Sequence, residues 1–286
     1  MEHPRRILQR HGLRPKKSLG QNFLYDDHIL ARIVEIAAVS QEDDVLEIGP
    51  GVGHLTRHLA RAARRVVAVE LDDRLMPVLR EQLAGAEQVM LVHGDILEQD
   101  PARWFGHRAN NGNGASNEHG AYKVVANVPY YITGAILQHL LDGPSKPQLM
   151  VMTLQKEVAE RLVAQPGEMT LLAVSVQFFG EPRIEGEIKA GAFWPRPDVD
   201  SAIVRIDLHR SPLLEPQEQA AFFRLVRTGF SQKRKQLQKN LRALGFERRQ
   251  TVALLRQAGV DPKRRAQTLS MEEWLAVYRT FARAGA

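Results

Sequence analysis

Short apolar runs alternate with amphipathic stretches from Val45 onward, and this alternation constrains the fold more than any other feature. Helical patterns at His54–Ala63 and Arg74–Leu83 separate the first runs. Such alternation is typical of a parallel sheet with helices on both faces, so we predict an α/β domain. A run at Ala173–Phe179 fits a buried helix or a strand equally well. The predicted strands are Val45–Ile48, Val66–Glu70, Val89–Val92, Lys123–Ala126 and Leu149–Leu154.

The character of the sequence changes after Leu208, where two Ser/Glu-Pro pairs are followed by helical patterning alone. We therefore predict three parts: a basic N-terminal arm (1–24), an α/β domain (25–210) and a small helical domain (211–286). His107–Ala121 is rich in Asn and Gly and has almost no apolar residues, so we expect a mobile surface insertion there. The predicted C-terminal helices are Gln217–Phe230, Lys233–Leu244, Arg248–Gln257 and Met271–Phe281.

Charge is segregated along the chain, with balances of +5, −8 and +9 in residues 1–24, 25–210 and 211–286. Two basic ends around an acidic middle favour a polyanionic partner, although solvated basic faces would give the same balance. The chain has no cysteine, which excludes disulfides, thiolate catalysis, iron–sulfur clusters and Cys-ligated zinc. No apolar run reaches eighteen residues, so we expect no membrane span.

A glycine-rich loop, Glu47–Gly53 (EIGPGVG), closes the first predicted strand and opens a helix. Glycines allow the backbone to approach a ligand closely, and the helix N-terminus offers free N–H groups. The dinucleotide fingerprint would need glycine at position 54, which is His54. An acid followed by G-x-G-x-G is instead the form that Rossmann-like methyltransferases use for S-adenosylmethionine. By itself such a loop is a weak signal, because many are plain turns.

Two carboxylates strengthen the hypothesis. Glu70 ends the second strand, where an acid can accept hydrogen bonds from both ribose hydroxyls, and Asp95 follows the third strand, where it can accept from the adenine amino group. Ligands bind at the carboxyl edge of open α/β sheets, and all three features fall on that edge. Together they predict an S-adenosylmethionine site.

Asn127-Val128-Pro129-Tyr130 directly follows the fourth predicted strand. This segment suits methylation of an exocyclic amine, whose lone pair is delocalised into its ring. The Asn127 side-chain oxygen and the Val128 carbonyl can accept the two amine hydrogens, Pro129 stiffens the turn, and Tyr130 can stack on the base. An isolated Asn-x-Pro would be read as an ordinary turn, but this one follows an S-adenosylmethionine loop.

Further segments occur in an order that resembles the ribosomal RNA adenine dimethyltransferases of the KsgA (RsmA) type, from about residue 14 to 281. This family has a Rossmann-like methyltransferase domain and a small helical domain. Its members dimethylate the N6 amines of two adjacent adenosines near the 3′ end of small-subunit rRNA. The segments are KSLGQNFL (17–24), EIGPGVG (47–53), NVPYYIT (127–133), QKEVAERL (155–162), AFWPRPDVDS (192–201), FSQKRKQLQKNL (230–241) and RAQTL (265–269).

The resemblance also implies roles for individual residues. Tyr130 and Phe193 would sandwich a flipped adenine, and Asp72 and Ile96 would line the adenosine pocket. It implies S-adenosylmethionine without a metal, a pre-30S partner, a monomer, and a cytoplasmic location. The implied cofactor contacts are Asn22, Leu24, Gly49, Gly51, Glu70, Asp95 and Asn127, and the implied RNA contacts are Lys16, Lys17, Lys233, Arg234, Lys235, Lys239 and Arg242.

Three departures from the family pattern stand out. Val128 replaces the usual leucine but keeps the backbone carbonyl, whereas Glu168–Leu172 and Asp198 remove positive charge on the expected RNA side. Two alternatives remain. One is a macrolide-resistance methyltransferase that modifies a large-subunit rRNA adenine. The other is a nucleic-acid-binding factor that keeps the fold without catalysis, which the intact NVPY segment argues against.

Overall fold

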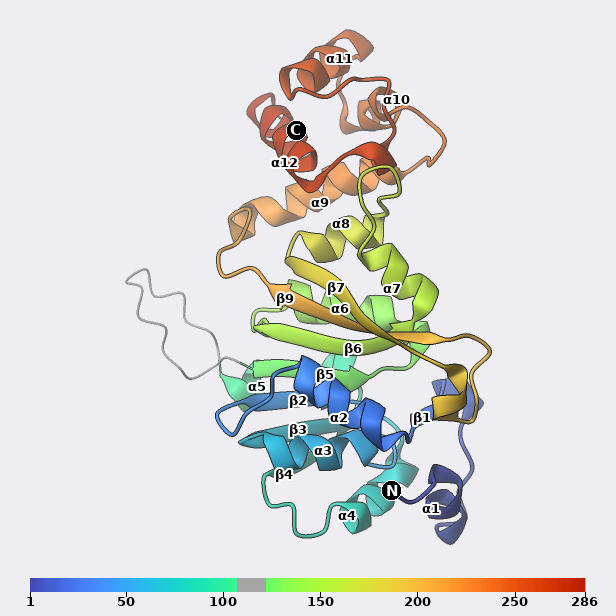
Figure 1. Cartoon of the computed structure of the whole chain (residues 1–286). Coiled ribbons are helices and arrows are strands. Elements are labelled where there is room, and N and C mark those ends of the chain that lie inside the picture. Colours follow the sequence, from blue (N-terminus) through green and yellow to red (C-terminus); the bar gives the residue numbers. More distant parts are fainter. Residues whose placement is uncertain (107–121, 286) are drawn as a thin grey trace. The chain divides into compact units, whose positions relative to one another are not determined.

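The computed structural model describes residues 1–106 and 122–285, so the predicted insertion His107–Ala121 lies outside it. The chain divides into two compact units (Figure 1). The first comprises Met1–Ala159 and Glu181–Leu208, and the second comprises Glu160–Gly180 and His209–Ala286. The boundary after Leu208 lies two residues before the one expected from sequence. The membership of Glu160–Gly180 in the helical unit was not anticipated.

A seven-stranded sheet organises the first unit, in the order β4-β3-β2-β5-β6-β9-β7. Neighbouring strands from β4 to β6 are parallel, with Val45 opposite Val66 and Val124 opposite Met150. The five predicted strands therefore pair in parallel, as expected. Strand β9, which the sequence did not predict, runs antiparallel to β6. The strands are β2 (Asp44–Ile48), β3 (Arg65–Glu70), β4 (Val89–His93), β5 (Tyr122–Asn127), β6 (Leu149–Gln155), β7 (Gly180–Ile188) and β9 (Ser201–Leu208).

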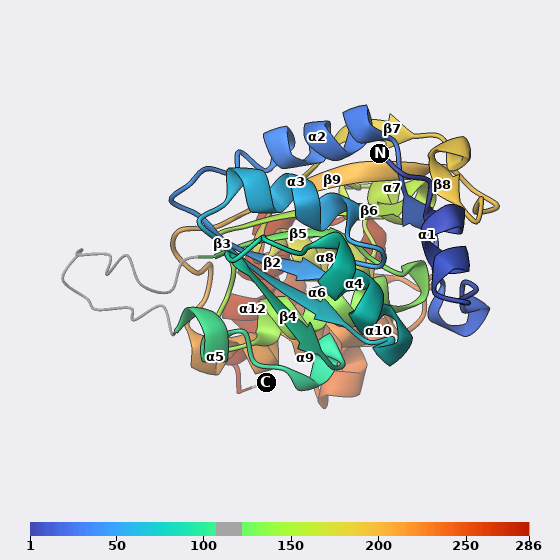
Figure 2. The same cartoon turned by 90° about the horizontal axis from the view of Figure 1, so that it is seen from below.

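Helices cover both faces of this sheet (Figure 2). Leu30 of α2 and Leu59 of α3 pack with Val45, Val66 and Val151 in the main core, and α4 packs against β4 on the same face. Helices α5 and α6 lie on the other face (Figure 2). Their bounds are α2 (Asp27–Ile36), α3 (His54–Ala62), α4 (Met76–Gln82), α5 (Ala102–Phe105) and α6 (Thr133–Asp142); α7 (Lys156–Leu162) crosses the boundary between the units.

The N-terminal residues belong to the first unit and do not form the expected separate arm. Helix α1 (Pro4–Arg10) buries Ile7 and Leu8 completely, and both pack in a cluster with Phe23. The apolar side of α1, which the basic composition of this segment obscured, is the physical reason. Strand β1 (Phe23–Leu24) then pairs with β8 (Phe193–Trp194). This pairing joins two segments that are about 170 residues apart in the sequence.

The second unit is all-helical. Trp274, Phe222 and Phe281 are fully buried in it. Gly229 is required by this packing, because a Cβ there would lie 2.5 Å from the Trp274 ring. The ambiguous run at 173–179 is helical. The helices are α8 (Leu171–Gln177), α9 (Pro216–Phe230), α10 (Leu237–Leu241), α11 (Arg248–Gln257) and α12 (Met271–Arg283).

The basic segment of the second unit differs from its predicted form. We expected one helix over Lys233–Leu244, but α10 begins only at Leu237. The Leu237 amide donates to the Arg264 carbonyl at 2.7 Å, a tertiary bond that an upstream helical turn would not permit. Lys233, Arg234 and Lys235 therefore occupy an exposed turn. Among the residues the structure describes, no helix is long and apolar enough to cross a membrane.

Candidate functional site

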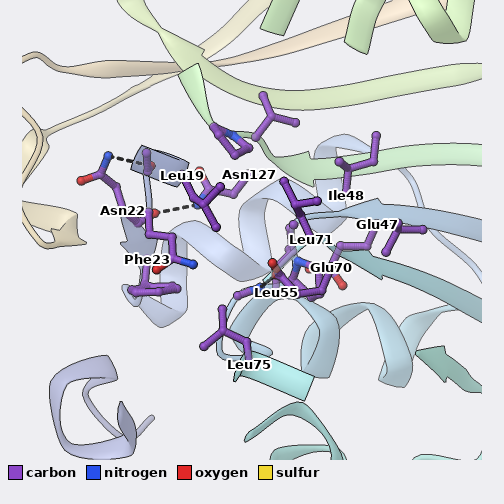
Figure 3. Close-up of a pocket in the computed structure, with 18 of the residues that line it drawn as sticks. Leu19, Asn22, Phe23, Glu47, Ile48, Leu55, Glu70, Leu71, Leu75 and Asn127 are labelled. Carbon is purple, nitrogen blue, oxygen red and sulfur yellow. Dashed lines mark hydrogen bonds between the residues drawn. The ribbon is translucent and has the colours of Figure 1, made fainter. Parts of the chain in front are cut away.

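A pocket opens at the carboxyl edge of the sheet in the first unit and encloses about 970 Å³, including its mouth (Figure 3). The loops after β2, β3, β4 and β5 form its walls, together with residues 19–24. Glu47, Glu70 and Asn127, from three different strands, contribute to one lining (Figure 3).

The glycine loop forms one wall and depends on its glycines. Gly51 has a φ of +61°, and a Cβ at this position would lie 2.8 Å from the Phe23 ring. Both the backbone conformation and the close approach of Phe23 therefore exclude a larger residue. Gly53, also in the left-handed region, is the N-cap of α3, so the helix starts directly from the loop.

Glu70 presents a carboxylate to the pocket in a well-defined orientation. Its Oε2 accepts a hydrogen bond from the Gly51 amide at 3.1 Å, and Oε1 accepts one from the Asp72 amide at 2.8 Å. Each oxygen keeps a second lone pair with which to accept a ligand hydroxyl. The side chain is 6% exposed, and its burial raises the pKa of Glu70 above the ordinary value.

Two buried polar residues of the lining, Glu47 and His54, were not predicted as ligand contacts. Glu47 is 1% exposed, its Oε2 has no hydrogen-bond partner among the described residues, and burial raises its pKa to about 8. His54 lies 3.3 Å from the Leu24 carbonyl through Nδ1, and burial lowers its pKa to about 4, so the ring is neutral. The sequence signal for Glu47 was its position as the acid that opens the glycine loop.

The loops after β3 and β4 complete the adenosine side. Asp95 and Ile96 line the pocket, and the Asp95 side chain accepts from the Leu97 amide at 2.9 Å. Asp72 does not line it: Arg74 pairs with Asp72 at 2.6 Å and holds the pKa of that carboxyl below its usual range. Gln21 also donates to Asp72, at 2.8 Å, so Asp72 connects the loop after β3 to the N-terminal segment that carries Gln21. Leu71 takes the place in the lining that we expected for Asp72.

Asn127 and Asn22 are in direct contact (Figure 3). The Asn127 Nδ2 donates to the Asn22 carbonyl at 3.1 Å. The Asn127 Oδ1 accepts from the Thr153 hydroxyl. One lone pair of Oδ1 and one N–H of the amide remain available to a ligand.

The rest of the tetrapeptide follows on the same wall. Val128, Pro129 and Tyr130 line the pocket, and the Val128 carbonyl accepts no backbone hydrogen bond from the described residues. The Tyr130 hydroxyl lies 2.6 Å from the Ser201 hydroxyl, and burial raises the pKa of Tyr130. Tyr131, which the sequence analysis did not single out, is 57% exposed and also lines the pocket.

Phe193 does not occupy the position expected of a stacking face. It is 2% exposed and packs in the core with Leu24 and Ile203, and it is absent from the pocket lining. The pairing of β8 with β1 is the reason, because it sets Phe193 opposite the buried Leu24. Leu24 itself lines the pocket. Phe193 therefore does not supply the expected second stacking face in this arrangement.

The basic residues of the resemblance fall in both units. Lys16 and Lys17 are exposed in the first, immediately before the pocket residues 19–24. Lys233, Arg234, Lys235, Lys239 and Arg242 are exposed in the second, and none of them forms an ion pair with a described residue. Within residues 1–106 and 122–285 no cluster of three potential metal ligands occurs.

Comparison with known proteins places this geometry in a family context. The chain matches the ribosomal RNA adenine dimethylase family over residues 12–283. Ribosomal RNA small subunit methyltransferase A of Dehalococcoides mccartyi strain 195 is 42% identical over 275 residues, covering 96% of this chain and 91% of that protein. The protein of the same name from Moorella thermoacetica is 41% identical, covering 96% and 95% respectively.

Solved structures agree on the fold. The crystal structure of the 23S rRNA methyltransferase ErmE aligns with a TM-score of 0.72 and 31% identity, covering 91% of this chain and all of ErmE (100%). A dimethyladenosine transferase from Plasmodium falciparum aligns with a TM-score of 0.75 and 24% identity, covering 92% of this chain and 98% of that one, and supports the fold alone.

Proposed function

Since this chain belongs to the ribosomal RNA adenine dimethylase family, we propose that it dimethylates the N6 amines of two adjacent adenosines near the 3′ end of small-subunit rRNA, using S-adenosylmethionine. The observation that carries the proposal is the Asn127 side chain, fixed at the edge of a pocket that also contains Glu70. It offers an oriented acceptor for an amine beside a carboxylate suited to a ribose.

The residues of the pocket fit S-adenosylmethionine. Glu70 retains lone pairs for two ribose hydroxyls, and Asp95 stands at the next strand end for the adenine amine. Glu47 has a buried oxygen without a partner, which an N–H group of the ligand would satisfy. When bound, S-adenosylmethionine supplies an electrophilic methyl group.

The chain's own residues orient the target amine. Asn127 Oδ1 and the Val128 carbonyl can each accept one amine hydrogen, which directs the nitrogen lone pair away from the ring system of the base. The tetrahedral arrangement resembles the transition state more than the planar ground state, so these bonds strengthen during the reaction. No strong base is needed, because the amine proton becomes acidic as the nitrogen gains the methyl group. Water then accepts this proton.

The exposed basic side chains of the second unit bind the rRNA phosphates. Lys233, Arg234 and Lys235 form a basic turn before α10, and Lys239 and Arg242 extend it. Lysine and arginine side chains that neutralise phosphates release counterions from the RNA, and this contribution to binding does not depend on the base sequence. We assign substrate affinity chiefly to this surface and chemistry to the pocket. The enzyme acts as a cytoplasmic monomer on the pre-30S particle.

The main alternative is modification of large-subunit rRNA. ErmE, a 23S rRNA methyltransferase, is 31% identical to this chain, whereas the two proteins named small subunit methyltransferase A are 42% and 41% identical. The higher identity favours the small-subunit substrate. A catalytically silent RNA-binding factor is less consistent with a pocket in which Asn127, Glu70 and Asp95 all take part.

Methyl transfer to purified particles tests the proposal. Wild-type protein and tritiated S-adenosylmethionine are incubated with unmethylated small and large subunits separately. We expect incorporation that approaches four methyl groups per small subunit and none into the large subunit. Incorporation into the large subunit alone would favour the alternative.

A further inference from the structure

Two strands of the sheet change from apolar to polar at the same end of the same face. On β6, Leu149 and Val151 point into the main core, and the next residue on that face is Thr153. On the antiparallel neighbour β9, Ile203 lies in the core opposite Thr153, and the next residue on the face is Ser201. Both hydroxyl residues are 0% exposed.

A buried hydroxyl is unfavourable unless it forms hydrogen bonds, so valine and alanine would serve a purely structural role better here. The partners of these two hydroxyls are specific. Thr153 donates to the Asn127 side-chain oxygen, and Ser201 lies 2.6 Å from the Tyr130 hydroxyl. In the proposed function, Asn127 accepts a hydrogen of the target amine and Tyr130 stacks on the base.

The bond from Thr153 holds the oxygen end of the Asn127 amide in place. The Asn127 Nδ2 donates to the Asn22 carbonyl, and Thr153 holds Oδ1 from the other side, from the register position directly beside Asn127. An amide rotated by 180° would present N–H donors to an amine that needs acceptors. The Asn22 carbonyl can only accept, so it opposes that rotation, while the Thr153 hydroxyl holds the amide from a second side. Without the Thr153 hydroxyl, the Asn22 contact alone holds the amide.

Ser201 acts on Tyr130 in a comparable way. The Tyr130 ring is half-buried, and the Ser201 hydroxyl anchors its far end. A ring anchored at the hydroxyl and at the backbone keeps one orientation of its face. Without the anchor, the face on which a base would stack becomes free to tilt.

We propose that Thr153 and Ser201 are positioning residues for methyl transfer, and that the antiparallel pair β6–β9 thereby fixes the amide of Asn127 and the ring of Tyr130. This inference rests on the proposed function. Neither hydroxyl touches the substrate, because both are buried behind the residues they hold.

The test compares single-atom changes with matched controls. Thr153→Val and Ser201→Ala remove the two hydroxyls. Thr251→Val and Ser145→Ala are the controls, since both residues are also buried and their hydroxyls bond only to backbone carbonyls. For each variant we would measure kcat and KM for small-subunit particles, the Kd of S-adenosylmethionine and the Tm.

We expect Thr153→Val and Ser201→Ala to lower kcat about 10- to 100-fold, the loss that removal of an outer hydrogen-bond partner causes at metal sites. The Tm should fall no further than in the controls, and KM should change less than threefold. Thr153→Ser, which keeps the hydroxyl, should restore most of kcat. Tyr130→Phe removes the same bond as Ser201→Ala, so the double variant should be no slower than the slower single variant.

The outcomes separate the two claims. Active wild-type protein with kcat unchanged in both variants would overturn the positioning roles and leave the proposed function intact. A kcat loss matched by the controls, or multiplicative losses in the Ser201–Tyr130 pair, would likewise assign only a structural role to these hydroxyls. A wild-type protein that methylates no rRNA would overturn the proposed function and this inference together.

Discussion

The backbone amide of Gly51 donates a hydrogen bond to the carboxylate of Glu70 across 3.1 Å, which joins the glycine loop after β2 to the end of β3. One bond therefore connects the two features that sequence reasoning assigned to the same ligand. Because the acceptor is a buried carboxylate, the contact holds the loop and also points the remaining lone pairs of Glu70 at the pocket.

Replacement of Glu70 should weaken S-adenosylmethionine binding. Glu70→Ala removes the charged acceptor for the ribose hydroxyls, which is worth about 1.5–3 kcal/mol, or about 10- to 150-fold in Kd. Calorimetric titration measures this. The exposed Glu87 provides the control, and Glu87→Ala should bind normally. An unchanged Kd in Glu70→Ala would remove this residue from the site.

Replacement of Asn127 should separate chemistry from RNA binding. Asn127→Ala leaves the basic surface intact, so affinity for small-subunit particles should persist, while kcat falls by a factor of about 100 or more because the amine loses an oriented acceptor. Filter binding and methyl incorporation are measured on the same preparation. Equal losses of affinity and turnover would show that Asn127 acts mainly in substrate binding.

Charge reversal should have the opposite effect. Lys233, Arg234 and Lys235 changed to Glu should weaken particle binding and flatten its dependence on salt, since fewer counterions are released. The matched control reverses Arg61, Arg80 and Arg103, which are exposed in the first unit and carry the same total charge. If the salt slope is the same in both triple variants, the turn before α10 is not the RNA-binding surface.

The buried acid Glu47 predicts a pH dependence of stability. Its pKa is raised by burial to about 8 in the folded protein, from an ordinary value of 4.5. Its stabilising contribution is therefore fully present below pH 4.5 and is lost as the pH rises toward 8, because only the unfolded chain ionises in that interval. Glu47→Gln should remove the effect, at about 1.4 kcal/mol per pKa unit.

Denaturant unfolding of the ligand-free protein at several pH values gives the required comparison. The free energy of unfolding of Glu47→Gln, relative to wild type, should rise between pH 5 and pH 8. A constant difference would mean that Glu47 ionises normally in the folded state.

Sequence patterns predicted correctly those elements whose structure depends on local sequence alone. The strands at Val45, Val66 and Val89 and the glycine loop follow from local periodicity and from the turn, and the carboxyl-edge rule brought Glu70 and Asp95 to one pocket. The family resemblance added Asn22, whose contact with Asn127 joins positions 105 residues apart.

Long-range pairing accounts for what the sequence did not reveal. Phe193 was expected at the site, but its strand pairs with β1 and buries it. Thr153 and Ser201 read as ordinary strand residues, and only the register of β5, β6 and β9 shows which side chains they meet. The membership of Glu160–Gly180 in the helical unit likewise depends on tertiary contacts.

Mass spectrometry of rRNA from a strain that lacks this gene identifies the nucleotides that the protein modifies. We expect two adjacent N6,N6-dimethyladenosines near the 3′ end of small-subunit rRNA to become unmethylated. A plasmid copy of the wild-type gene should restore them, and the Asn127→Ala gene should not. Unaltered small-subunit rRNA in the deletion strain, with a methyl group missing from a large-subunit adenosine, would overturn the proposed function.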